Sequence, residues 1–308
     1  MGEVFEVLSF RALWTPELIA VLLIIGALYF LLTRRWRTRF TSAGKQTFKQ
    51  DLMFVTGLVC LYLGWGSPLY SVGHMMVSIH MIQMVFAYFL AVPLFILALP
   101  KWLLAGVYNW LDKKVQPLRM LIFHPIIGLI FFNALFSIYH IPVVFDFLML
   151  RPGVHSVYEM VMFVAAIMMW WHMLAPLPSK QYLHDFRRII YIFGNGILIT
   201  PACALIIFSG TALYDTYTDM SFWAQVMAYC IPGGAAVPAS MFGGPGVLGG
   251  LDAYSDQQLG GVAMKVGQEL VYGTTIGFVF KQWLQKESHQ DGELTISDIP
   301  SHIKTGER

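Results

Sequence analysis

The chain has 308 residues, of which 57% are hydrophobic and only 12% are charged, and its mean hydropathy is +0.62. Because soluble domains carry roughly 25% charged residues, this composition excludes an ordinary water-soluble protein and predicts an integral membrane protein. A formal net charge of +2 and three scattered cysteines indicate neither a nucleic-acid partner nor a disulfide framework.

Seven segments are long and apolar enough to cross a membrane as helices, which takes about 20 residues each. We therefore predict an all-α bundle whose spans lie at 16–33, 50–66, 73–99, 119–140, 155–176, 188–210 and 257–283. Together they form one membrane domain over residues 1–286. The segment 215–257 separates the last two spans, and its second part is rich in Gly and Pro. A polar tail follows at 287–308.

The basic residues alternate between the two ends of these spans. Seventeen Lys and Arg residues follow spans one, three, five and seven, whereas the opposite segments hold only Arg11 and Arg151, and Lys265 lies inside span seven. Cytoplasmic segments of membrane proteins are enriched in Lys and Arg. We therefore expect the N-terminus outside, the C-terminus in the cytoplasm and the segment 215–257 on the outer face.

This topology sorts the histidines by depth. Four of them, from spans three, four and five, fall at or near the predicted outer face: His74, His80, His140 and His155. Ionisable side chains inside a membrane usually face the bundle interior or a cavity, so these four are candidates for one site. We interpret His124 and His172, at the inner face, as structural residues.

Helical spacing adds methionine thioethers to the candidate histidine ligands. Residues four apart share a helical face, so Met76, His80 and Met84 form one stripe, and His155 and Glu159 form another. Imidazole binds copper, zinc, iron and nickel, and thioether added to imidazole selects Cu(I). Glu159 is positioned to orient the ring of His155. The pattern favours a metal site, with simple packing of methionine and histidine as the alternative.

Four segments of the chain carry a resemblance to a known family. They are HMIQM (80–84), HPIIGLIFFNALFSIYHIPVVFD (124–146), HSVYEMVMFVAAIMMWW (155–171) and SDQQLGGVAMK (255–265). In order and spacing they resemble the multi-spanning CtaG-type cytochrome c oxidase assembly factors of Gram-positive bacteria. The chain departs from the family pattern at Met84 and Glu159, where relatives often have histidine.

The resemblance implies a multi-pass protein of the bacterial plasma membrane that helps to mature a caa-type heme-copper oxidase and that is not itself an enzyme. It also implies copper as the cargo and the copper-containing oxidase subunit as the partner, within the lipid bilayer and without nucleic acid. The expected ligands are His80 and Met84, completed by His140 and His155. Incoming copper would first meet His74 and Met76, and Glu159 would support His155. Two alternatives are a membrane carrier or enzyme for heme or quinone, and a scaffold without metal.

Overall fold

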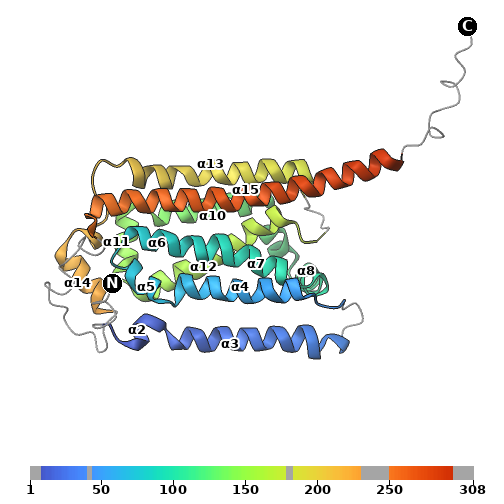
Figure 1. The fold of residues 1–308 in the computed structure, drawn as a ribbon, viewed down its shortest axis with the longest axis horizontal. Coiled ribbons are helices and arrows are strands. Elements are labelled where there is room, and N and C mark those ends of the chain that lie inside the picture. The colour runs from blue at the N-terminus through green and yellow to red at the C-terminus, as the bar shows by residue number, and fades with distance from the viewer. Residues whose placement is uncertain (1–7, 40–43, 178–182, 230–249, 294–308) are drawn as a thin grey trace, which may run out of the picture.

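The computed structural model describes residues 8–39, 44–177, 183–229 and 250–293, and these ranges are helical with short connections. The helices lie side by side in one elongated bundle (Figure 1). Their bounds at the N-terminal half are α2 (Phe10–Trp14), α3 (Pro16–Phe30), α4 (Phe48–Trp65), α5 (Pro68–Gly73), α6 (Val77–Met84), α7 (Val92–Ala98), α8 (Lys101–Lys114) and α9 (Gln116–Ile122). Two π-helical turns, η1 (Leu31–Arg35) and η3 (Val85–Ala91), extend α3 and join α6 to α7, and the 3₁₀ turn η2 spans Arg37–Arg39.

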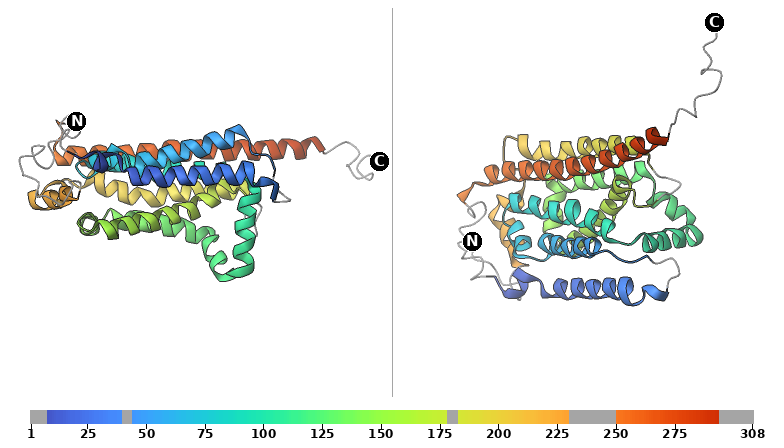
Figure 2. Two further views of the ribbon diagram at one scale, coloured as in Figure 1. Left: turned by 90° about the horizontal axis from the view of Figure 1, so that it is seen from below. Right: turned by 45° about the vertical axis from the view of Figure 1, so that its right-hand side comes forward.

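The second half of the described chain supplies the remaining helices. They are α10 (Pro125–Tyr139), α11 (Pro142–Met149), α12 (Pro152–Leu174), α13 (Asp185–Phe208), the 3₁₀ turn η4 (Asp215–Tyr217), α14 (Met220–Ala228) and α15 (Ala253–Glu293). Figure 2 shows α8 and α9 projecting away from the bundle at one end. The core is continuous through α6, α10, α12, α13 and α15.

Five stretches of the described chain are long and apolar enough to cross a membrane: Phe10–Arg35, Phe48–Gly73, Val77–Ala98, Pro152–Leu174 and Asp185–Phe208. A sixth is the pair α10 and α11, which is bent by 78°. The predicted seventh span, 257–283, lies within α15. That helix packs along α13 (Figure 1) but is not among the candidate spans, because Lys265, Gln268 and Glu269 make its middle polar. An all-α membrane protein is thus confirmed, and length and composition support five or six spans among the described residues, whereas the seventh span stays a prediction.

Proline explains where several helices begin, and one of these prolines shapes the later site. Pro142 occupies the first turn of α11, where its missing N–H costs nothing. The residue before a proline is pushed out of helical geometry, and Ile141 is indeed extended, with ψ of 126°. Helix α10 therefore cannot run on into α11. His140 lies at the resulting bend.

The start of α6 is capped from another helix. Met76 has extended backbone geometry and no side chain of the same segment caps the helix. Instead, Asp256 of α15 accepts hydrogen bonds from the N–H of Val77 at 2.6 Å and of Ser78 at 3.4 Å, and also from the Ser78 hydroxyl. An acidic cap satisfies donors that a helix start leaves unpaired. The beginning of α15 therefore fixes the beginning of α6.

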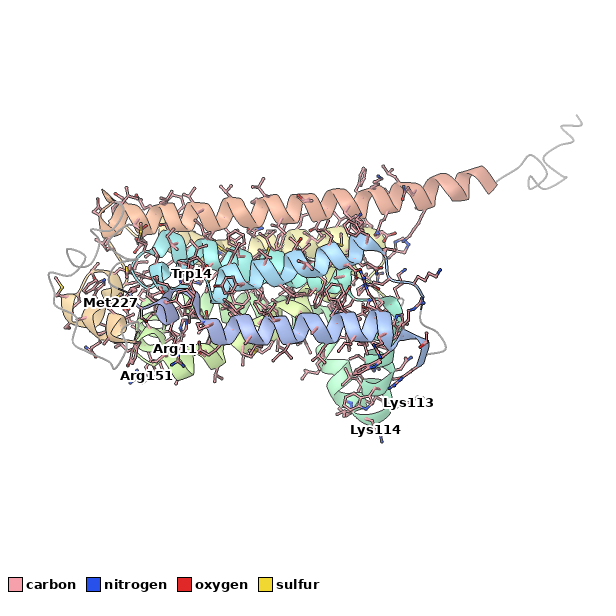
Figure 3. The ribbon with its side chains drawn as sticks, turned by 60° about the horizontal axis from the view of Figure 1, so that its bottom comes forward. Arg11, Trp14, Lys113, Lys114, Arg151 and Met227 are labelled. Carbon is pink, nitrogen blue, oxygen red and sulfur yellow. The ribbon has the colours of Figure 1, made fainter. Side chains whose placement is uncertain are left out.

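Basic residues that the sequence assigns to opposite sides of the membrane lie at opposite ends of the bundle. Lys113 and Lys114 lie at one end, and Arg11 and Arg151 lie at the other (Figure 3). At the first end, Arg34 pairs with Asp51 at 2.5 Å, in agreement with the alternation of basic segments along the sequence. Which end faces the cytoplasm stays a prediction.

Two predicted boundaries can be compared with the structure. Helix α15 continues to Glu293, so residues 287–293 of the predicted tail are helical, and 294–308 lie outside the described residues. The predicted outer segment 215–257 contains η4, α14 and the start of α15, and its residues 230–249 also lie outside the described ranges.

Candidate functional site

Three of the four outer histidines, His80, His140 and His155, lie with their rings against the ring of Tyr139, and the fourth, His74, lies against His155. The ring of His80 stacks on the ring of Tyr139, with centroids 5.6 Å apart and an angle of 9°. The ring of His155 also stacks on Tyr139, at 5.8 Å, and the ring of His74 lies 6.3 Å from His155. The structure thus brings together residues that the sequence could only assign to similar depth.

Different helices supply each member of this histidine cluster, which we define as His74, His80, His140 and His155. His80 lies on α6, His155 lies in the first turn of α12, and His140 lies at the bend after α10. His140 has no exposed surface, and His80 and His155 are also buried. His74 follows α5 and is partly exposed, and burial lowers its pKa below the usual value for histidine. Lowering the pKa keeps the imidazole neutral, which is the form that binds metals.

Two nitrogens in the cluster lack a hydrogen-bonding partner. His140 Nδ1 lies 2.7 Å from the carbonyl oxygen of Phe136 and therefore carries the proton that it donates there. This fixes Nε2 of His140 as the nitrogen with the free lone pair, and that atom is buried without a partner. Nε2 of His80 is buried without a partner as well. Leaving such groups unpaired is costly, so both atoms point to a missing ligand.

The cluster as it stands is not a complete coordination sphere. Among the residues that the structure describes, no three His, Cys, Asp or Glu side chains are placed to hold one ion. One reason is that Nε2 of His155 is hydrogen-bonded to the hydroxyl of Tyr139, at 2.7 Å. The same nitrogen lies 3.9 Å from Oε1 of Glu159, which places Glu159 beside His155 as its spacing suggests.

The two methionines of the predicted stripe lie in different surroundings. Met84 is buried in the main core, whereas Met76 precedes α6 and packs beside Leu13 and Trp223. The helix begins at Val77, so the four-residue spacing does not place Met76 on a helical face with His80. Only Met84 keeps the predicted relation to His80.

A cleft lies next to the cluster, beside Ser156 and Glu159. It has a volume of about 300 Å³ and is lined by Thr15, Leu18, Trp65, Tyr70, Ser156, Glu159 and Met160. Glu159 therefore faces this cleft on one side and His155 on the other.

The turn η4 covers the cluster from the end of the bundle. The hydroxyl of Tyr214 donates to the carbonyl of His140 at 3.1 Å, and that of Tyr217 donates to the carbonyl of Gly73 at 2.7 Å. Asp146 of α11 holds η4 in place by accepting from the N–H and the hydroxyl of Thr216, at 3.0 and 2.7 Å. These contacts exclude water from His140.

Sequence reasoning missed the tyrosines of this site. Tyr139 separates two histidines, and Tyr214 and Tyr217 close the cluster. Aromatic residues make up 15% of the chain, so no pattern distinguishes these three from tyrosines that only pack. The one available signal is that Tyr139 directly precedes His140.

A comparison with known protein families identifies the family to which the chain belongs. The family model described as cytochrome c oxidase caa3 assembly factor (Caa3_CtaG) matches residues 27–286, which is most of the chain. The matched range contains the four segments that carry the resemblance and every residue of the histidine cluster. Neither a curated protein nor a solved structure matches the chain.

Proposed function

Because the chain belongs to the family of caa3 cytochrome c oxidase assembly factors, we propose that it binds copper at the histidine cluster and delivers it to the copper-containing subunit of the oxidase. The chain is a multi-pass protein of the bacterial plasma membrane, and an assembly role brings it into contact with oxidase components. In this proposal copper is a cargo, and the protein catalyses no reaction.

The observation that carries the proposal is the pair of free nitrogens. Nε2 of His80 and Nε2 of His140 are buried, unpartnered and in the same cluster. Both imidazoles lie in an apolar setting that disfavours their charged form, so each offers a lone pair. Met84, four residues after His80, adds a thioether on the same helix. Two imidazoles and a thioether form a soft donor set that suits Cu(I).

The remaining predicted residues take supporting roles. His155 becomes a further ligand when the hydroxyl of Tyr139 leaves its Nε2. His74 and Met76 lie at the start of the cluster, before α6 begins, and receive incoming copper. Glu159 lines the cleft and orients the ring of His155. A weakly completed site suits a carrier, because cargo that is held by few ligands can be released.

The arrangement of rings favours a small ion over heme. Tyr139 lies between His80 and His155 with ring centroids at 5.6 and 5.8 Å, so its ring fills the space where a macrocycle between these histidines would have to sit. A scaffold without metal remains the competing function, and it predicts that oxidase maturation survives the loss of the free nitrogens.

The test is a titration of the purified full chain with Cu(I) in competition with a chromophoric chelator. The double variant His80→Ala and His140→Ala is expected to lose one bound equivalent and to fail in oxidase maturation. His184→Ala is the control, because this histidine is exposed at the start of α13. If the double variant binds as much copper as the wild type, the copper proposal is wrong. If it loses copper while the oxidase matures normally, the scaffold function holds.

A further inference from the structure

A second pair of histidines with unpaired ring nitrogens, His124 and His172, lies at the opposite end of the bundle. Nδ1 of His124 and Nε2 of His172 are buried and have no hydrogen-bonding partner. His172 is only 3% exposed. We propose that these two histidines form a second Cu(I) site, with Met168 as its thioether. This site is independent of the outer histidine cluster, and it would give a ligand role to two histidines that the sequence led us to interpret as structural.

The packing of α10 against α12 brings the two histidines to the same place in the bundle. At Gly128 the helices are so close that a Cβ atom would lie 3.0 Å from the carbonyl oxygen of Met168. His124 precedes Gly128 by four residues, and His172 follows Met168 by four. Because the two helices run in opposite directions, both histidines lie about one turn from this contact and toward the same end. The residues just before the two histidines confirm this approach of the helices, because the rings of Phe123 and Trp171 are in contact, with centroids 4.8 Å apart.

A third unpaired group faces the same place from α13. The ring of Tyr191 meets the ring of His172 edge-on at 5.8 Å, and the hydroxyl of Tyr191 is buried without a hydrogen-bonding partner. Three helices therefore each contribute one unpaired polar atom. Buried polar groups in folded proteins are nearly always paired, so three such atoms together indicate an occupant.

The donor types decide what that occupant is. Two imidazoles with buried nitrogens that have no hydrogen-bonding partner are donors that suit a metal ion. Met168 is buried and shares a helical face with His172. Structural zinc takes four ligands, whereas imidazole with thioether selects Cu(I). An ordered water is the competing occupant, since water also satisfies two or three polar groups.

The site is held in place without any metal. Arg188 of α13 donates to the carbonyl of Met173 at 3.2 and 3.0 Å and to that of Leu174 at 3.0 Å. These bonds close the last turn of α12, next to His172. The end of α12 that carries the ring of His172 is therefore ordered by protein contacts, so copper binding does not have to supply the free energy for ordering it.

The test counts Cu(I) on the purified full chain under reducing conditions. The wild type is expected to bind two equivalents. The double variant His124→Asn and His172→Gln should bind one, the outer double variant His80→Ala and His140→Ala should also bind one, and their combination should bind none. Asn and Gln keep hydrogen-bonding groups, so an ordered water would survive these substitutions. X-ray absorption on the outer variant should show two nitrogen neighbours and one sulfur, and Met168→Leu should remove the sulfur.

Each site can fail separately in this design. If the wild type binds one equivalent and the outer variant binds none, the inner site is wrong and the outer proposal stands. If the inner variant alone abolishes binding, the outer proposal is wrong and the inner site stands. The outer variant tests the inner site with both inner histidines intact, so the inference stays falsifiable even if the inner variant does not fold.

Discussion

The hydroxyl of Tyr139 lies 2.7 Å from Nε2 of His155, and this hydrogen bond removes one imidazole from the donors of the histidine cluster. His80 and His140 keep free nitrogens in the same cluster. A single phenol group thus sets how many ligands are available to the proposed cargo. The bond also gives the first prediction.

Tyr139→Phe is expected to release Nε2 of His155 and to add a third imidazole to the outer copper site. One added ligand should tighten Cu(I) binding by about tenfold, which corresponds to about 1.4 kcal/mol. Chelator competition measures the affinity, and X-ray absorption counts the nitrogen neighbours. Tyr158→Phe is the matched control, because its hydroxyl donates to the carbonyl of Leu135 instead of to a histidine. Equal affinities in the two variants would contradict the role given to Tyr139.

Gly260→Ala is expected to destabilise the protein, because the new Cβ would lie 3.1 Å from backbone atoms of Ser78 and Val77, which cannot easily move. Gly277→Ala on the same helix is the control, since nothing lies within 4 Å of its Cβ position. Alanine is favoured over glycine inside a helix by about 1 kcal/mol, so the control should be neutral or stabilising. Thermal unfolding in detergent compares the two, and a Gly260 variant as stable as the control would refute close packing of α15 on α6.

Arg188→Met is expected to be strongly destabilising, by roughly 3–5 kcal/mol, because it removes the guanidinium group that pairs with the buried carboxylate of Asp185. Lys286 also pairs with Asp185, at 2.5 Å, and should offset part of that loss. The neighbouring Arg187 is exposed, so Arg187→Met should change stability little. Chemical denaturation of the two variants provides the comparison. Similar losses at both positions would mean that the buried network contributes nothing specific.

The first turn of α14 should lose stability in acid. Asp219 accepts from the hydroxyl of Ser221 and from the N–H groups of Ser221 and Phe222, at 2.5, 2.7 and 3.1 Å, and these bonds lower its pKa. A lowered pKa means that the cap is fully present above the usual aspartate value and is lost as the pH falls through the lowered one. The rate of hydrogen exchange at the Phe222 amide is measured in the wild type and in Asp219→Asn at each pH, and the two rates should become equal only at acid pH. A difference that persists there would rule out protonation of Asp219 as the cause.

Hydrophobicity and proline predict much of this fold from the sequence. The predicted spans 155–176 and 188–210 differ from α12 and α13 by only two or three residues at each end. Apolar length fixes these helices, and Pro152 marks where α12 begins. The third span was predicted to begin at residue 73, but α6 begins at Val77, because the chain first completes α5 and then extends at Met76.

Contacts between helices could not be predicted from the sequence, because residue spacing within one helix does not determine which helices lie next to it. The stacking of His80 on Tyr139 and the capping of α6 by Asp256 join residues that are 59 and about 180 positions apart. Helix α15 illustrates the same point. Gln257 at its start donates to the carbonyl of Ile206 on α13, and Gly260 lies against the backbone of Ser78 on α6, and neither contact can be derived from hydropathy.

The length of α15 has a mechanical consequence. Its 41 residues make one helix about 60 Å long, whereas the apolar layer of a bilayer is about 30 Å thick. Figure 1 shows its C-terminal part extending well past the end of α13. Since the helix is a single stiff rod, pulling or pushing its far end along the axis would displace Asp256 and loosen the first turn of α6, the helix that carries His80. A displacement of the far end of α15 along its axis would thus be transmitted to the surroundings of His80 at the other end of the bundle.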